Sequence, residues 1–221
     1  VTGAHPDMPL KTRWKHLHLP WKWERMVLNW RSKEMNEVYL KKLQPPENRV
    51  DVVLDTDCYN EIDDQYALAF CIGAKDKIEL LSAQAATFGK GVACDYQLGM
   101  EVSYQEILKV YGVCGVSDKY PAYRGATRPM GVDDPVMSDA VQNITRTSKE
   151  HPDEIIYILA TGCCTNVASA FYLEPSIKEN TVVIWLGGTC LEDDTELAGE
   201  CNLAWDRVAG QYLMSLDIPL I

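Results

Sequence analysis

The sequence predicts an α/β fold, in which a mostly parallel, Rossmann-like open sheet is flanked by helices and preceded by an N-terminal helical extension. Three observations predict it. From Arg49 onward, short β-branched apolar segments alternate with helical segments, which is the pattern of successive βαβ units. Acidic residues follow the first apolar segment directly, at the position where α/β proteins bind ligands. The chain of 221 residues, 47% of them hydrophobic, is long enough to bury one substantial core.

Residues 1–49 differ in composition from residues 50–221, and we expect them to form an extension of a single α/β domain. The extension carries ten Lys/Arg against five Asp/Glu, whereas the rest of the chain carries eleven against twenty-seven. It also holds four of the six tryptophans. A helix is expected over Glu24–Leu43, ended by Pro45 and Pro46. This helix could pack on the main domain or on a neighbouring subunit.

The elements of the domain follow one another at regular intervals. Strands are expected at Val50–Leu54, Ile78–Ala83, Glu154–Leu159, Thr181–Leu186 and from Ile218 onward. Helices are expected at Ile62–Gly73, Tyr96–Tyr111, Val136–Ser148, Asn166–Tyr172 and Asp206–Ser215. Tyr120–Met130 carries turn signals with aromatic and cationic members, and is expected to be a loop that either lies near the site or makes an ordinary surface connection. Because a parallel strand at Ile218 lacks a following helix to cover it, we expect the domain to be incomplete at its C-terminus.

Composition excludes several classes of partner. The net charge of −11 argues against nucleic acid, because phosphate binding needs clustered cations. No stretch approaches the roughly 20 apolar residues of a membrane span, so no membrane association is expected. The eight cysteines include no Cys-x-x-Cys pair, and several lie in apolar segments, where a thiol behaves as a small hydrophobe. We therefore expect reduced cysteines and a cytoplasmic location.

The strongest chemical signal is a group of five carboxylates directly after the first strand. Crowded carboxylates either raise one another's pKa or bind a hard cation such as Ca²⁺ or Mg²⁺, which prefers oxygen ligands. The positive end of the following helix could account for one or two of Glu61, Asp63 and Asp64. It does not account for Asp55 and Asp57, which alternate along the end of the strand. A metal site is therefore the favoured interpretation.

Three motifs occur in order along residues 50–221. The first is the aspartate-rich segment 55–64, the second is Ala-Thr-Gly-Cys-Cys-Thr-Asn at 160–166, and the third is Trp-Leu-Gly-Gly-Thr at 185–189 with Glu-Cys-Asn and an aspartate at 200–206. Together they resemble the D-x-D…D-D motif, the A-T-G-x-x-T-N turn and the E-x-N segment of the inosine-uridine-preferring nucleoside hydrolase family. The resemblance implies calcium-dependent hydrolysis of the N-glycosidic bond of a ribonucleoside or related N-riboside.

The resemblance also assigns the metal site and the catalytic group. Asp57, Asp64 and the backbone carbonyl of Thr161 would ligate Ca²⁺, and Asp57 would take a proton from the attacking water. Asp55 would orient these ligands from behind. The chemistry is coherent, because cleavage builds positive charge on the ribose, which nearby carboxylates stabilise, while a metal lowers the pKa of water.

Substrate contacts follow from the same resemblance. Asp63, Glu200 and Asn202 would hold ribose hydroxyls, and Lys90 stands about where many members place an asparagine near the ligand. Five residues separate Asp57 from Asp63, whereas the best-known members have a shorter proline-glycine linker. Family members also continue past the end of this chain and form homodimers or homotetramers, so a homo-oligomer is expected.

Two other functions remain open at this point. A phosphohydrolase could use Asp55 as its nucleophile with Mg²⁺, since a strand ending in D-x-D permits it. A non-catalytic module that binds a nucleoside or a metal is the other alternative, motivated by the incomplete C-terminus and the basic, Trp-rich extension.

Overall fold

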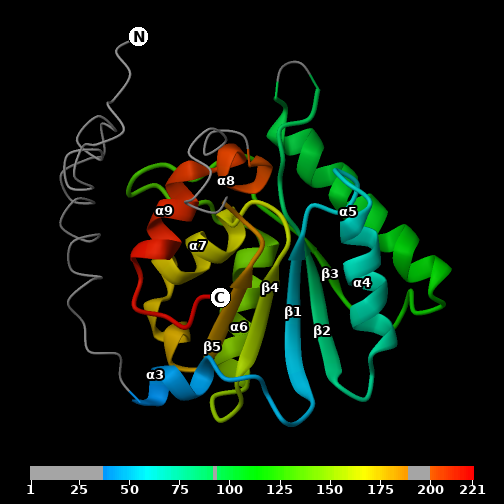
Figure 1. Ribbon diagram of the computed structural model, residues 1–221. Helices are drawn as coiled ribbons and strands as arrows, with labels where there is room; N and C mark the ends of the chain where they lie inside the picture. Colours follow the sequence, from blue (N-terminus) through cyan, green and yellow to red (C-terminus); the bar gives the residue numbers. More distant parts are fainter. Residues whose placement is uncertain (1–36, 92–93, 189–199) are drawn as a thin grey trace, which may run out of the picture. The chain divides into compact units, whose positions relative to one another are not determined.

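The computed structural model describes residues 37–91, 94–188 and 200–221, and one compact unit runs from Asn36 to Ile221. Its centre is a five-stranded sheet in which every neighbouring pair of strands is parallel (Figure 1). The strands are β1 (Val50–Thr56), β2 (Ile78–Ala85), β3 (Ala122–Arg124), β4 (Ile156–Ala160) and β5 (Thr181–Trp185). Their order in the sheet is β3-β2-β1-β4-β5. The predicted open, parallel α/β sheet is confirmed.

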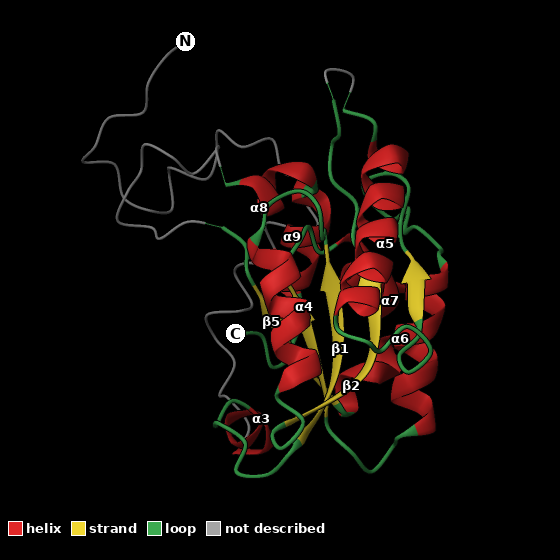
Figure 2. Cartoon of the chain, turned by 90° about the vertical axis from the view of Figure 1, so that its right-hand side faces the viewer, coloured by secondary structure: helices red, strands yellow, loops and turns green. Residues whose placement is uncertain are grey.

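Helices cover both faces of this sheet (Figures 1 and 2). The helices are α3 (Glu37–Lys42), α4 (Asp63–Gly73), α5 (Tyr96–Val113), α6 (Asp139–Glu150), α7 (Thr165–Leu173), α8 (Cys201–Trp205) and α9 (Arg207–Ser215), with a 3₁₀ helix at Pro175–Glu179. Helices α4 and α5 pack on one face, and α6, α7 and α9 pack on the other. The fold therefore has three layers, with the sheet in the middle.

Strand β1 shows why both faces of the sheet are apolar. Successive side chains of a strand point to opposite faces. Val52 and Leu54 pack with α4 and α5, whereas Val53 packs with α6, α7 and α9. All three side chains are buried, as is typical of a parallel strand covered on both sides. The apolar run before the acidic loop therefore places that loop at the end of a central strand.

The predicted helices from Ile62 to Ser215 are all present, with ends shifted by three residues or fewer. The first four predicted strands are also present. From Ile218 onward the chain forms an isolated parallel bridge between Leu220 and Val183 rather than a full strand. Of the helix expected over Glu24–Leu43, only α3 falls within the described residues.

Three elements were not predicted, because all are too short for periodicity to reveal them: strand β3, helix α8 and the 3₁₀ helix at Pro175–Glu179. Strand β3 lies inside the expected loop Tyr120–Met130, and it is a three-residue strand at the edge of the sheet. Helix α8 has five residues and begins at a capping glutamate, Glu200. In β3 and α8 the local sequence carries little hydrophobic pattern, and tertiary contacts decide the conformation.

The cysteines within the described part of the chain are free thiols, most of them buried or partly buried. All seven cysteines within the described part of the chain are free, while Cys190 lies outside it. Burial raises the pKa of Cys58, Cys163 and Cys164 above the usual range of a thiol, which keeps these groups protonated. No helix among the described residues is long and apolar enough to cross a bilayer.

Ser138 caps α6, and its replacement offers a direct test of this helix start. Its side chain accepts a hydrogen bond from the backbone N–H of Val141. Ser138→Ala is expected to lower the free energy of unfolding by about 1 kcal/mol, measured by urea denaturation. Ser117→Ala, in an exposed turn, is the control and is expected to change little. Equal stability of the two variants would contradict the capping role.

Candidate functional site at the ends of strands β1 and β4

The acidic loop lies at the position where the order of strands in the sheet reverses. Strands β2 and β3 lie on one side of β1, and β4 and β5 lie on the other. The ends of β1 and β4 are neighbours, since Asp55 pairs with Ala160 in the register. Asp57 follows β1, and Thr161 follows β4. Because open α/β sheets bind ligands beyond the carboxyl ends of strands at such a point, this is the candidate site.

Two buried carboxyl groups, those of Asp57 and Asp64, face each other at this point. They are 1% and 4% exposed and lie within hydrogen-bonding distance of each other. Burial, reinforced by the charge of Asp64, raises the pKa of Asp57 to about 8. Burial also raises the pKa of Asp64, against hydrogen bonds donated to its Oδ1 by Thr161 Oγ1 at 2.5 Å and by Thr56 Oγ1. The fold thus holds two carboxyl groups together where their joint ionisation is unfavourable.

Asp55 lies behind this pair and is fully buried. Its Oδ1 accepts a hydrogen bond from Asn166 Nδ2 at 2.8 Å, while its Oδ2 has no partner. Burial raises the pKa of Asp55 to about 7, opposed by the hydrogen bond from Asn166 and reinforced by the charge of Asp64. Asn166 also accepts from the backbone N–H of Ala126 and donates to the carbonyl of Ala85. Sequence reasoning gave Asn166 no role, although it ends the second motif.

The donor set of the site fits a hard cation. Asp57 and Asp64 offer carboxylate oxygens, and the carbonyl of Thr161 accepts one hydrogen bond, from Asn202 Nδ2 at 2.7 Å, which leaves its second lone pair. The unpartnered Oδ2 of Asp55 adds a further buried acceptor beside them. A cation that takes oxygen ligands would offset the repulsion within this group. These oxygens are of the type that Ca²⁺ prefers.

The predicted ribose contacts lie around the same strand ends, but two of them are engaged with the backbone. Asn202 donates to the carbonyls of Thr161 and Leu186, at 2.7 and 2.8 Å. Glu200 caps α8, accepting from the N–H groups of Asn202 and Leu203, and it also accepts from Gly188. Asp63, at the start of α4, is exposed.

Lys90, in the segment after β2, contacts the ring of Tyr59, in the loop after β1. Lys90 Nζ lies 4.7 Å from the centroid of the Tyr59 ring and 5.7 Å from that of Phe88. Tyr59 belongs to the long loop after Asp57, and its φ of 108° is a conformation that residues other than glycine rarely adopt. No sequence pattern reveals this pairing, because the two residues lie on separate loops.

The loop after β3 is anchored to the site by buried hydrogen bonds. Asp206, 2% exposed, accepts from the N–H of Met130 at 2.7 Å, from Thr165 Oγ1 at 2.5 Å and from the N–H of Ala209 at 2.9 Å. Ala126 is tied to the side chain that holds Asp55. Of the two interpretations of Tyr120–Met130, the structure therefore favours a segment packed behind the site.

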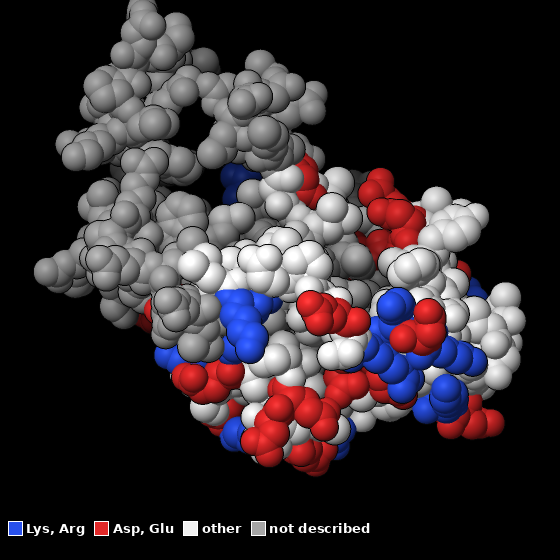
Figure 3. All heavy atoms as spheres, turned by 60° about the horizontal axis from the view of Figure 1, so that its bottom comes forward, with Lys and Arg blue, Asp and Glu red and all other residues white. Residues whose placement is uncertain are grey.

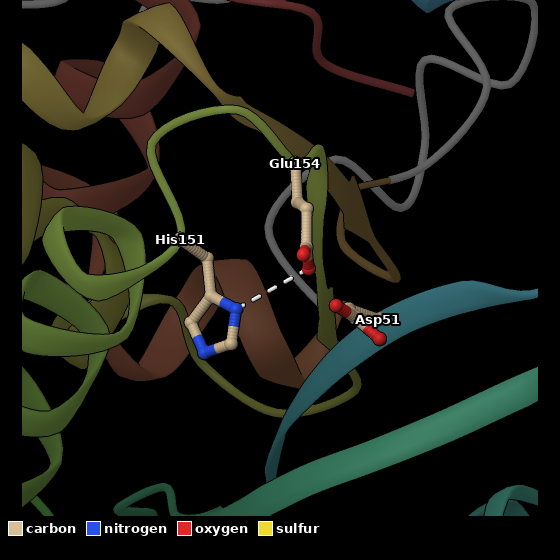
Figure 4. Close-up of side chains that lie close together, drawn as sticks. All are labelled: Asp51, His151 and Glu154. Carbon is tan, nitrogen blue, oxygen red and sulfur yellow. Dashed lines mark hydrogen bonds and ion pairs between the residues drawn. The ribbon is translucent and has the colours of Figure 1, made fainter.

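A second group of potential ligands lies at the opposite end of the sheet, where the strands begin (Figure 4). One atom each of Asp51, His151 and Glu154 lie within 4.8 Å of one another, and His151 Nδ1 is 3.2 Å from Glu154 Oε2. Burial, followed by the proximity of Glu154, raises the pKa of Asp51. Acidic and basic side chains are interspersed over this side of the molecule (Figure 3). His151 is partly exposed and lies at the opposite end of the sheet from the candidate site.

Residues 52–221 match the family described as inosine-uridine preferring nucleoside hydrolase. The fold is similar to that of a plant nucleoside hydrolase, with 21% identity, a TM-score of 0.63, and coverage of 80% of this chain and 59% of the other. A purine-preferring ribonucleoside hydrolase from Gardnerella vaginalis gives 19% identity, a TM-score of 0.63, and coverage of 77% and 59%. An inosine-uridine preferring nucleoside hydrolase from Bacillus anthracis gives 19% identity, a TM-score of 0.57, and coverage of 77% of this chain and 63% of the other.

This chain therefore spans less than two thirds of the length of each of these three solved structures. No curated protein sequence matches it.

Proposed function

Because the chain belongs to the inosine-uridine preferring nucleoside hydrolase family, we propose that it takes part in calcium-dependent hydrolysis of the N-glycosidic bond of a ribonucleoside or related N-riboside. The observation that carries this proposal is the buried pair of Asp57 and Asp64 beside the carbonyl of Thr161, at the strand ends where such sheets bind ligands. Purine- and inosine-uridine-preferring hydrolases among the similar structures support a nucleoside as the substrate class.

The metal ligands in this proposal are Asp57, Asp64 and the carbonyl oxygen of Thr161. When bound, Ca²⁺ supplies a positive charge that lowers the pKa of water. Asp57 would accept the proton of the attacking water in its ionised form, which a bound cation favours over the protonated form. Asp55 and Asn166 fix the strand ends behind these groups through their 2.8 Å hydrogen bond.

The ribose is held by Asp63, Glu200 and Asn202 in this proposal, with Lys90 at its rim. Asn202 and Glu200 must exchange part of their present backbone hydrogen bonds for ribose hydroxyls. Departure of the base leaves positive charge on the ribose, and the carboxylates around it stabilise that charge. We further propose that the protein forms a homodimer or homotetramer, as the family resemblance implies. We also propose a cytoplasmic location, which the free thiols of the described cysteines support.

The phosphohydrolase alternative loses support, because its nucleophile would be Asp55. That carboxyl group is fully buried, and one of its oxygens accepts a hydrogen bond from Asn166, which weakens it as a nucleophile. The alternative of a non-catalytic binding module is tested by measuring base release together with calcium binding.

The test measures base release and metal binding on the same protein. The chain of 221 residues, stripped of metal and then supplied with Ca²⁺, is incubated with a panel of purine and pyrimidine ribonucleosides, and free base is quantified by chromatography. We expect base release that depends on Ca²⁺ and a calorimetric signal for Ca²⁺ binding. Calcium binding without base release would favour a non-catalytic module. Absence of both would overturn the proposal.

A further inference from the structure

Lys90, in the segment that follows β2, is a cation without a carboxylate partner among the described residues. Among the described residues no aspartate or glutamate forms an ion pair with it, although the chain carries a net charge of −11. Lys90 instead lies against the rings of Tyr59 and Phe88. An aromatic face attracts an ammonium group but does not neutralise its charge or accept all of its hydrogen bonds. The positive charge therefore remains available to a ligand.

The backbone conformation of Tyr59 is energetically unfavourable. Its φ of 108° is rarely adopted by side-chain-bearing residues, and such conformations persist only where the surroundings enforce them. Lys109 Nζ also lies near its ring, 5.9 Å from the centroid, and is paired with Glu106 at 2.8 Å. Tyr59 thus stands between two lysines, of which Lys90 alone keeps an unshared charge.

Packing ties Lys90 to the candidate site on the side of β2. The backbone N–H of Ala86 donates to the carbonyl of Thr56 at 2.8 Å, which joins the segment after β2 to the end of β1. Gly89, next to Lys90, lies directly against the ring of Trp205 in α8, the helix that carries Asn202. Lys90 is therefore placed between the loop that follows Asp57 and the helix that carries a proposed ribose contact.

We infer that Lys90, held against Tyr59, is an anion subsite that selects an N-riboside with a phosphate group on its ribose. This inference rests on the proposed function, because it adds a substituent to that substrate. A neutral ribose hydroxyl needs only a neutral donor, for which an amide suffices, whereas a phosphate gains from a full positive charge. The charge matters more here because the carboxylates of the candidate site would otherwise repel an anion.

The experiment compares ligands that differ only in the phosphate. Dissociation constants of inosine and of its 2′-, 3′- and 5′-monophosphates are measured by calorimetry on the calcium-loaded full chain, with base release followed in parallel. At least one monophosphate is expected to bind about tenfold more tightly than inosine, as befits a hydrogen bond to a charged group. The preference is expected to shrink as salt is raised. The isomer that binds best identifies the ribose position facing Lys90.

Variants show whether the preference for the monophosphate depends on Lys90 itself or on the overall charge of the protein. Lys90→Asn is expected to abolish the preference for the monophosphate over inosine, and Lys90→Arg is expected to retain this preference. Lys119→Asn is the matched control, because Lys119 Nζ lies 4.6 Å from the Tyr120 ring in the turn before β3.

Inosine binding without any preference, or a preference that survives Lys90→Asn, overturns the inference and leaves the proposed function intact. Failure of every nucleoside and nucleotide to bind overturns both.

Discussion

Replacing Asp57 by asparagine is expected to abolish calcium binding and, at the same time, to stabilise the metal-free protein. The loss of function follows from its two proposed roles, as a metal ligand and as the proton acceptor. Base release is expected to fall by at least about 100-fold. The gain in stability follows from burial, because the Asp57 carboxyl group is 1% exposed and faces that of Asp64. An amide removes that repulsion with little change of shape.

The sign of the pH dependence is fixed by the direction of the pKa shift. The pKa of Asp57 rises from 3.8 to about 8 on folding, so its contribution to stability is present below about pH 4 and is lost as the pH rises through 8. The metal-free wild-type protein should therefore become less stable over this range. The Asp57→Asn variant should lose much of this dependence, with a gain on the order of 1–2 kcal/mol at pH 8.

Both halves of this prediction are measurable in one preparation. Urea denaturation between pH 5 and pH 8 in the presence of a chelator gives the stability, and calorimetry gives the calcium affinity. Asp118→Asn, which removes one exposed negative charge in the turn before β3, is the control and should change neither. Unchanged calcium affinity in the Asp57→Asn variant, or a loss of its metal-free stability, would refute the prediction.

Gly125→Ala is expected to produce the largest loss of stability among the substitutions considered. A Cβ at this position would lie 2.0 Å from the carbonyl oxygen of Ala85 and 2.5 Å from Asn166 Nδ2. The first contact is with the backbone of a central strand, so no side-chain rotation can relieve it. The second displaces the amide that holds Asp55. We expect the free energy of unfolding to fall by about 3 kcal/mol or more.

Gly73→Ala is the matched control for this substitution. No atom lies within 4 Å of the Cβ that it would add, and Gly73 is the last residue of α4. Its replacement should leave stability unchanged or raise it slightly, because alanine restricts the unfolded chain. Urea denaturation of both variants measures the difference. Similar stability of the Gly125→Ala variant and the wild-type protein would show that the strand end can shift to accept the methyl group.

Sequence patterns revealed the parts of this protein that depend on local periodicity. Strand β1 is predictable because a strand that is buried on both faces has a continuous apolar run in its sequence. Helices α4, α5, α6, α7 and α9 are predictable because each has nine residues or more. Strand β3 and helix α8 were missed because three and five residues carry no period. Their conformation is decided by contacts with β2 and with the cap at Glu200.

The site shows the same division between local and distant determinants. The motifs identified Asp57, Asp64 and Thr161, and the structure brings them together at one point. They did not reveal that Asn166 links Asp55 to the end of β2 and to the loop after β3, since the bond between Asn166 and Asp55 spans 111 positions of the chain. The contact of Lys90 with the Tyr59 ring was hidden for the same reason.

The pairing of β1 with β4 has a consequence for the order of folding. Helices α4, α5 and α6 are formed by the chain between these two strands, yet the hydrogen bond from Thr161 to Asp64 spans 97 positions. Closing so long a loop is slow and comes after local structure has formed. Thr161 therefore joins Asp57 and Asp64 late, so the proposed set of metal ligands is complete only once β1 and β4 have docked. Calcium should accordingly slow unfolding more than it accelerates folding.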